Sequence, residues 1–285
     1  MTDAVRFEWR PHLDGGTLLC AFHGWNDGGD AATTAAAYLR DRWGARRFAG
    51  IDPEPFYDFQ VTRPTVRLEG GVTRRIEWPE NDFFHASLPE REMAVLLGIE
   101  PNVRWRSFSS TIVETAQALG ARSLVTLGAF LADVPHSVPP PVAGTAADEE
   151  TAARLGVVPS RYEGPTGIVG VLQDAAARAG LDSVSLWAAV PHYLPAGTNP
   201  KAALALVQKL SVYLGTTVET DTLARAAATW EAQVATMIEE NAELQAYVQR
   251  LEEGVGGTDF EVPSGEALAA ELERFLREQR NDGDA

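Results

Sequence analysis

Short apolar runs followed by stretches with helical spacing constrain the fold of this chain more than any other feature. The runs occupy residues 17–22, 93–98, 123–128 and 183–190, and helices are expected over 30–43, 105–119, 168–179 and 199–214. Strands that lack polar alternation are buried on both faces, which is typical of parallel sheets covered by helices. We therefore predict an α/β fold, a three-layer, mostly parallel sheet with helices on both faces.

The charge and cysteine content exclude several classes of protein. The chain has 24 basic and 40 acidic residues, a net charge of −16, which disfavours nucleic acid as a partner. The single cysteine, Cys20, lies in an apolar run and is expected to be a reduced core residue. No apolar run approaches the roughly 18 residues of a membrane span, and the first residues do not resemble a signal peptide. We expect a cytoplasmic protein without a membrane partner.

The chain divides by composition into two parts. Residues 1–218 carry the strand and helix pattern, whereas residues 219–285 contain 16 acidic and 5 basic residues and contribute −11 to the net charge. We expect an α/β domain over 1–218 and an acidic helical hairpin and tail over 219–285. Within the first part, residues 65–78 alternate around Gly70 and Gly71, which predicts a β-hairpin with a charged face toward solvent.

The acidic part has a heptad-like pattern. Apolar residues recur at spacings of four and three, with one polar position, which predicts one continuous helical seam of about four heptads. A glycine-rich break and a second stripe at Leu268, Leu272, Phe275 and Gln279 suggest an antiparallel partner helix. The hairpin either packs on its own sheet or forms an oligomer or partner contact in which Asn241 sets the register. The interface candidates are Leu223, Trp230, Val234, Met237, Asn241, Leu244, Val248 and Leu251.

Polar and aromatic residues follow several of the predicted strands, where open α/β sheets bind ligands. The candidates for lining a pocket are Trp25, Asn26, Asp27, Asp30, His136, Tyr162, Thr166, His192 and Tyr193. The two aspartates could equally cap the following helix, and His136 could be an ordinary loop residue held by neighbouring prolines. The glycine spacing in residues 22–30 matches neither a dinucleotide fingerprint nor a P-loop.

Known catalytic patterns are missing from the sequence. The five histidines show no metal-ligand spacing such as HExxH, and no serine lies in a GxSxG elbow. Cys20 does not occupy a loop position suited to a nucleophile. The residues therefore leave any catalytic group unknown, and we expect no cofactor and no metal.

Five stretches between about Phe22 and Leu204 together resemble one family, the bacterial and archaeal branch of the proteasome assembly chaperone 2 family. They are FHGWNDGGDAATTAA, LLGIEPNVRW, LVTLGAFLADVPHSVPPPVAGTA, YEGPTGIVGVL and SLWAAVPHYLPAGTNPKAAL. The resemblance implies a phosphorylase/hydrolase-like fold similar to purine nucleoside phosphorylases, self-association and a possible protein partner in the proteasome system. The chain departs from relatives that dock on the proteasome because it ends RNDGDA, without their hydrophobic–tyrosine tail, and Ser137 and Val138 follow His136 where threonine and arginine are common.

Two functions follow from these features. The first is a non-catalytic, self-associating assembly-chaperone-like or protein-interaction protein, which the resemblance and the acidic helices favour. The alternative is a nucleoside- or small-molecule-binding hydrolase-like or phosphorylase-like enzyme that uses a pocket at the carboxyl ends of the strands. Both depend on whether loops that are distant in sequence meet at one edge of the sheet.

Overall fold

The computed structural model describes residues 4–70, 73–146, 149–159, 163–194 and 197–254. Its strands are β1 (Val5–Phe7), β2 (Thr17–His23), β3 (Arg46–Ile51), β4 (Thr65–Glu69), β5 (Thr73–Glu77), β6 (Asp82–Leu88), β7 (Arg91–Ile99), β8 (Ser123–Ala132), β9 (Val142–Thr145), β10 (Val158–Pro159) and β11 (Asp182–Pro191). Its helices are α1 (Ala31–Arg42), α2 (Trp105–Ala118), α3 (Glu149–Leu155), α4 (Ile168–Arg178), α5 (Pro200–Leu214), α6 (Asp221–Glu239) and α7 (Ala242–Gly254), with a short 3₁₀ turn over Gly28–Asp30. In this part of the chain no helix is long and apolar enough to cross a bilayer.

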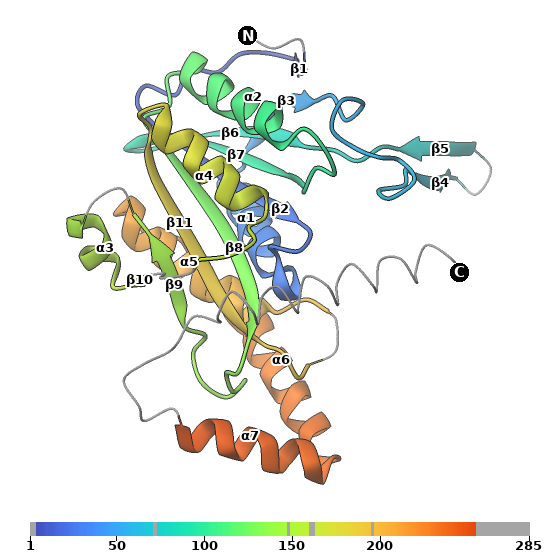
Figure 1. Cartoon of the computed structure of the whole chain (residues 1–285), viewed down its shortest axis with the longest axis vertical. Helices are drawn as coiled ribbons and strands as arrows, with labels where there is room; N and C mark the ends of the chain where they lie inside the picture. The colour runs from blue at the N-terminus through green and yellow to red at the C-terminus, as the bar shows by residue number, and fades with distance from the viewer. Residues whose placement is uncertain (1–3, 71–72, 147–148, 160–162, 195–196, 255–285) are drawn as a thin grey trace.

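Nine strands form one sheet in the order β1-β3-β6-β7-β2-β8-β11-β9-β10 (Figure 1). The four central strands, β7, β2, β8 and β11, are parallel, as their continuous apolar sequences predict. On one side β6, β3 and β1 continue the sheet in antiparallel fashion, and on the other side β9 runs antiparallel to β11. The sheet is therefore mixed, with a parallel centre whose strands all end at the same edge.

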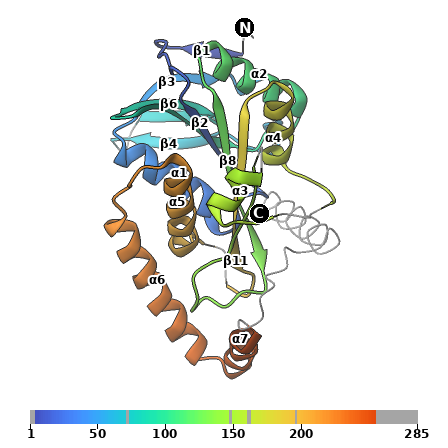
Figure 2. The same ribbon diagram turned by 90° about the vertical axis from the view of Figure 1, so that its left-hand side faces the viewer.

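Helices cover both faces of this sheet, which confirms the three predicted layers (Figure 2). Successive residues of β2 point to opposite faces, so that Leu19 and Ala21 pack with α1 and α5 while Leu18, Cys20 and Phe22 pack with α2 and α4. All five side chains are 1% exposed or less. Cys20 is therefore a core residue, as expected from its position in the apolar run.

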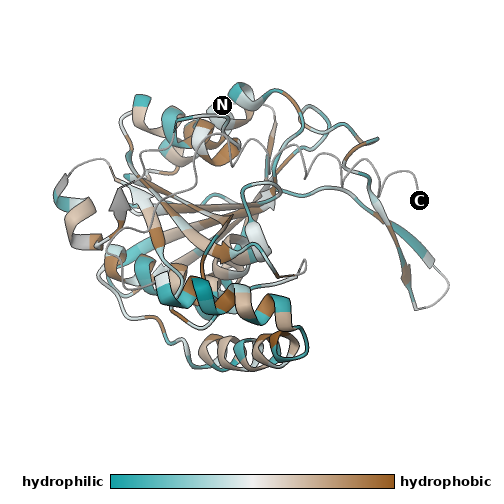
Figure 3. Cartoon of the chain, turned by 60° about the horizontal axis from the view of Figure 1, so that its bottom comes forward, coloured by the Kyte–Doolittle hydropathy of each residue, from teal (hydrophilic) through white to brown (hydrophobic). Residues whose placement is uncertain are grey.

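The predicted hairpin is present as the antiparallel pair β4–β5, which extends away from the body of the molecule (Figure 3). Gly70 adopts a φ of +60° at its tip, a conformation that glycine adopts without strain. The charged face meets solvent as predicted, and the apolar face does so as well, because every residue of both strands is exposed. Among the described residues no element covers the apolar face, because the ribbon projects beyond the described helices.

The prediction of one continuous helical seam from Leu223 to Leu251 is wrong. Helix α6 ends at Glu239, and Asn241 accepts hydrogen bonds from the backbone N–H groups of Glu243 and Leu244, each at 3.1 Å. Asn241 is thus the N-terminal cap of α7 and not a polar position inside a seam, since a capping asparagine starts a new helix. The expected partner helix, with its stripe from Leu268 to Gln279, lies outside the described residues.

The two C-terminal helices pack on their own chain. Leu223 belongs to the main core beside α5. Val234, Ile238 and Val248 are buried together, and Tyr193 and Leu194 from the loop after β11 pack against them. The partly buried Trp230, Met237 and Leu244 complete this cluster, while Leu251 is half-buried near the end of α7. These contacts fit the alternative in which the acidic helices cover their own sheet domain.

Candidate functional site

The loops that leave the four central strands meet at one edge of the sheet. The backbone N–H of Asn199 donates to Gly29 O at 2.7 Å, which joins the loop after β11 to the loop after β2. The N–H of His192 donates to Ala132 O at 3.2 Å, and that of Glu100 donates to His23 O at 2.8 Å. Turns that are far apart in sequence therefore converge, as expected for strands that run in parallel.

The first group of polar side chains surrounds Asp27 at the start of α1. Asp27 is 5% exposed, and its carboxylate accepts hydrogen bonds from Ala32 N at 2.7 Å and from the Thr33 hydroxyl. Burial raises the pKa of Asp27 to about 6, and the hydrogen bonds from Thr33 and Ala32 oppose that shift. This carboxylate is a helix cap in a desolvated site, which is one of the two roles that the sequence left open.

His23, Asp27 and Asp30 form the one cluster in the described chain with donor atoms placed to hold a metal ion. Nδ1 of His23 lies 3.6 Å from an Asp27 oxygen and 3.5 Å from an Asp30 oxygen, and the three donor atoms lie within 4.8 Å of one another. Such separations suit a small divalent cation. Asp27, however, already binds the start of α1, so the cluster has a sufficient structural explanation. Asp30 has a φ of +46° and makes no side-chain cap.

Trp25 and Asn26 follow β2 in sequence, and in space they lie beside Gly167 at the start of α4. Asn26 is fully buried, and its Nδ2 donates to Phe22 O at 2.8 Å. The Trp25 ring packs against the apolar cluster of Phe130, Ala132, Val134 and Ala189. Trp25 Nε1 and Asn26 Oδ1 are buried without a hydrogen-bond partner among the described residues. The ring is therefore held by its own core and is not an exposed stacking platform.

Glu100, which follows β7, connects this turn to α4. Its Oε1 accepts a hydrogen bond from Ile168 N at 2.8 Å at the first residue of that helix. Burial raises the pKa of Glu100, and hydrogen bonds from the backbones of Ile168 and Trp25 oppose the shift. A Cβ on Gly167 would lie 2.8 Å from Glu100 Oε1 and 3.0 Å from Asn26 Oδ1, so a larger residue there would displace the Glu100 carboxylate. The predicted candidate Thr166 is exposed beside this contact, and Tyr162 lies outside the described residues.

The second group contains His136, His192 and Tyr193. The backbone N–H of His136 donates to the Tyr193 hydroxyl at 2.8 Å, and His136 Nδ1 lies 3.1 Å from the same oxygen. Burial lowers the pKa of His136, and the positive charge of Lys201 adds to the shift. Lys201 Nζ also donates to His136 O at 2.6 Å and pairs with Glu231 of α6 at 2.7 Å.

Helix α7 covers this second group. The Tyr247 hydroxyl donates to Asp133 Oδ1 at 2.8 Å, and His192 Nδ1 lies 3.0 Å from the same oxygen. The Tyr247 ring meets the rings of Tyr193 and His192 edge-on, with centroids 5.8 and 5.7 Å apart. Ser137 donates to Glu252 at 2.5 Å. The hydrogen bonds and ring contacts thus separate the candidates into two groups, and the chain's own helix packs on the second group.

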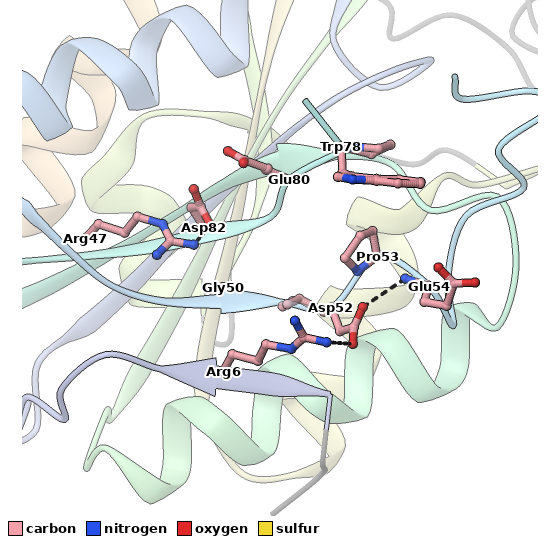
Figure 4. A pocket seen from close by; sticks show the side chains of 11 residues that line it. Arg6, Arg47, Gly50, Asp52, Pro53, Glu54, Trp78, Glu80 and Asp82 are labelled. Atoms are coloured by element: carbon pink, nitrogen blue, oxygen red, sulfur yellow. Dashed lines mark hydrogen bonds and ion pairs between the residues drawn. The ribbon is translucent and has the colours of Figure 1, made fainter. Parts of the chain in front are cut away.

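A pocket of about 290 Å³ lies elsewhere, at the antiparallel side of the sheet (Figure 4). Arg6 and Asp52 lie on one side of it, and Trp78 and Glu80 lie on the other. Arg6 pairs with Asp52 at 2.5 Å, and Arg47 pairs with Asp82 at 2.8 Å. The pocket lining contains two arginines and four acidic residues, so its net charge of −2 disfavours an anionic ligand. Sequence reasoning did not identify this pocket, because its residues come from three separate segments.

The model of the PAC2 family matches residues 21–238. The chain belongs to the PAC2 family. A PAC2 family protein from Streptomyces avermitilis is 43% identical, with a TM-score of 0.74 over 81% of this chain and 99% of that one. A proteasome-assembly chaperone homologue from Mycobacterium tuberculosis is 42% identical, with a TM-score of 0.75 over 81% and 99%.

More distant structures share the PAC2 fold. An archaeal proteasome activator from Pyrococcus furiosus is 18% identical, with a TM-score of 0.66 over 82% of this chain and 97% of that one. At that identity the likeness shows the fold alone. No curated protein matches the chain.

Three groups in this PAC2 protein were missed by sequence reasoning. Glu100 is the first acidic residue after β7. A carboxylate at the carboxyl end of a predicted parallel strand is a signal by which it could have been identified. Lys201 follows Pro200 at the start of α5, where a lysine has no special meaning until α6 brings Glu231 beside it. Tyr247 lies on α7, an acidic helix. The spacing of apolar residues cannot predict the direction that the chain takes after Glu240.

Proposed function

We propose that this PAC2 protein is a non-catalytic, assembly-chaperone-like protein that acts by binding other proteins. The observation that carries the proposal is the contact between α7 and the loops that follow β8 and β11. An enzyme of this architecture needs an open cleft at the carboxyl ends of its strands. Here Tyr193, His192 and Tyr247 pack on one another at that edge. The 42% identity to a proteasome-assembly chaperone homologue supports the same function.

The partner that we propose is a subunit of a proteasome core particle. The support is the likeness to the mycobacterial proteasome-assembly chaperone homologue, which extends over 81% of this chain. We also propose that the protein self-associates and that the α/β domain and the acidic helices divide near residue 218. The fold that we propose is phosphorylase/hydrolase-like, similar to purine nucleoside phosphorylases. A cytoplasmic location is supported by the buried, unpaired Cys20.

The test mixes the full-length chain with separately purified core-particle subunits from the same source. Native mass spectrometry is expected to show a complex of fixed stoichiometry that forms before the core particle closes. A chain that binds neither separate subunits nor their intermediates at tens of micromolar would overturn the proteasome assignment.

The alternative enzyme is tested on the same preparation. A ligand that binds only the native state adds about 2.7 kcal/mol to the free energy of unfolding when its concentration is 100 times its Kd. The melting temperature rises as a result. We expect flat melting curves with nucleosides, nucleobases and phosphate. A clear shift with any of them would favour the enzyme.

A further inference from the structure

The pocket of Figure 4 is built on the antiparallel strands β1, β3 and β6. Arg6 of β1 pairs across the sheet with Gly50 of β3, and Gly50 pairs with Asp82 of β6. Directly opposed residues point to the same face of a sheet, so Arg6 and Asp82 flank a position that has no side chain. A Cβ on Gly50 would lie 2.7 Å from an Arg47 nitrogen and 2.8 Å from an Asp82 oxygen. Gly50 therefore leaves the space in which Arg47 and Asp82 meet at the floor of the pocket.

The pocket contains more carboxylates than its arginines neutralise. Each of its two arginines pairs with an aspartate, as described above. The other two acids of the lining, Glu54 and Glu80, form no ion pair with a basic residue in the described part of the chain. Partial burial and the nearby charge of Asp82 raise the pKa of Glu80. A cation bound beside Glu80 would relieve this repulsion, so the pocket favours a positively charged group.

Trp78 gives the pocket an aromatic wall. Its side chain is 47% exposed, and its ring lies across the pocket from Pro53 and Glu54 (Figure 4). Phe59 meets the Trp78 ring edge-on, with the ring centroids 4.9 Å apart, which fixes the orientation of the indole. The face of an indole attracts an arginine or lysine cation that lies within about 6 Å of its centre. An indole and two carboxylates without basic partners are thus suited to a guanidinium or an ammonium group.

The size of the pocket limits what can enter it. Its volume of about 290 Å³ lies at the lower end of the roughly 300–1,000 Å³ that is typical of small-molecule sites. We therefore expect it to hold one basic side chain or a small organic cation, and not a large ligand.

The pocket shares Trp78 with an exposed apolar patch. Among the described residues seven large apolar side chains are exposed, and five of them lie within residues 61–78: Val61, Val66, Leu68, Ile76 and Trp78. Val66 pairs with Ile76 across the β4–β5 hairpin, so these two side chains share one face. Exposed apolar residues are ordinary when scattered singly, but a cluster of them marks an interaction surface. A cation that enters the pocket therefore lies next to a surface suited to a protein.

We propose that the pocket binds an arginine or lysine side chain of a partner protein, next to apolar residues of that partner that cover the hairpin. The cation lies against the Trp78 ring and pairs with Glu54 and Glu80. The apolar residues beside it cover Ile76 and Val66. Arg74 does not compete with this cation, because it is four residues from Trp78, about 13 Å along an extended chain.

This inference rests on the proposed function in one respect, that the partner is a protein. It does not depend on the proteasome assignment, because the chemistry of the pocket selects a kind of side chain and not a particular protein. The two proposals also fail separately. Native mass spectrometry tests binding of core-particle subunits, whereas the probes below test the pocket alone.

The test uses three fluorescent peptides of equal length and the full-length protein. The first peptide has a central arginine flanked by leucines. The second has citrulline in place of the arginine, which keeps the shape and removes the charge. The third keeps the arginine but has glycines in place of the leucines. In fluorescence anisotropy titrations, the first peptide is expected to bind at least fivefold more tightly than either of the others.

Each comparison has an outcome that overturns part of the proposal. Equal binding of the arginine and citrulline peptides would show that the pocket does not select a cation. Equal binding of the leucine and glycine peptides would show that the apolar patch is not used, which would leave a site for a small cation and remove the protein partner. No binding of the first peptide at about 1 mM protein would overturn the proposal as a whole.

Variants locate the binding in the pocket. Glu54→Gln with Glu80→Gln is expected to raise the Kd of the first peptide at least fivefold, and Trp78→Leu at least threefold. The matched control, Glu90→Gln with Glu240→Gln, removes the same charge from exposed positions after β6 and at the end of α6, and its Kd is expected to stay within twofold of the unmodified protein. Thermal melts check that all variants are folded. Pocket variants that bind like the unmodified protein, or a control that loses as much affinity as they do, would contradict the assignment.

Discussion

The hydroxyl of Tyr193 lies between two nitrogens of His136, 2.8 Å from the backbone N–H and 3.1 Å from Nδ1. Because the hydroxyl accepts from the backbone, its own hydrogen is free to point at Nδ1. That arrangement assigns the neutral imidazole with its proton on Nε2, which agrees with the lowered pKa of His136. The pair fixes the loop after β8 against the loop after β11.

Replacing Tyr193 with phenylalanine tests this pair. The change leaves the N–H of the buried His136 without its acceptor, which is expected to cost about 1–3 kcal/mol of unfolding free energy. Urea denaturation followed by circular dichroism measures the loss. The control is Tyr247→Phe, which removes a hydroxyl bound to the exposed Asp133 and is expected to cost about 1 kcal/mol or less. Equal losses in the two variants would contradict this account of Tyr193.

Asp27 makes stability depend on pH in the acidic range. Its pKa is about 6 in the folded chain and about 3.9 in an unfolded one, so the native state binds more protons between these values. Stability is therefore expected to fall as pH rises from 4 to 6, by an amount of the order of 2 kcal/mol. In Asp27→Asn this component of the slope disappears, as measured by urea unfolding across that range. Asp30→Asn, the neighbouring control, is expected to keep the slope, and an unchanged slope in Asp27→Asn would refute the assignment.

Gly167 allows Glu100 and Asn26 to approach the start of α4. In Gly167→Ala the new methyl group would lie 2.8 Å from Glu100 Oε1, so this carboxylate or the helix must move. The expected cost is about 1–3 kcal/mol, which a thermal melt would detect. Gly254→Ala is the matched control, because a Cβ there meets nothing within 4 Å. A Gly167→Ala protein that melts like the control would show that the approach is not tight.

Lys201 joins the loop that contains His136 to α6. Its side chain is 13% exposed and bonds both His136 O and Glu231. Lys201→Met is expected to cost about 1.5–3 kcal/mol, since hydrogen bonds to a charged group are lost. A double-mutant cycle with Glu231→Gln separates the ion pair from the bond to the carbonyl, with an expected coupling of about 0.5–3 kcal/mol. A coupling near zero would mean that the two side chains act independently.

Local pattern was sufficient for the core of the fold. The run TLLCAF predicted β2 because burial on both faces leaves no polar alternation, and the strand lies there as Thr17–His23. Asn199 and Pro200 predicted the start of α5, and Asn199 Oδ1 indeed accepts from Ala202 N at 2.9 Å. These features depend on neighbouring residues alone.

The direction in which α7 leaves α6 could not be predicted from the spacing of apolar residues. The spacing of apolar residues runs on from α6 into α7, and it cannot show that Asn241 turns the chain between them. For the same reason the contact of Tyr247 with Asp133 was unpredictable, because it joins residues 114 positions apart. The described candidate residues lie in loops at the predicted edge of the sheet, and their division into two groups follows from where α7 returns.

The position of α7 has a consequence for any small molecule aimed at the buried His136. Such a molecule must first separate Tyr247 from Asp133 and Glu252 from Ser137, so its observed Kd contains the equilibrium constant for lifting the helix. Substitutions that loosen α7 would then tighten binding although they touch no part of the molecule. The stability of the α7 contact thereby sets the affinity for such a molecule.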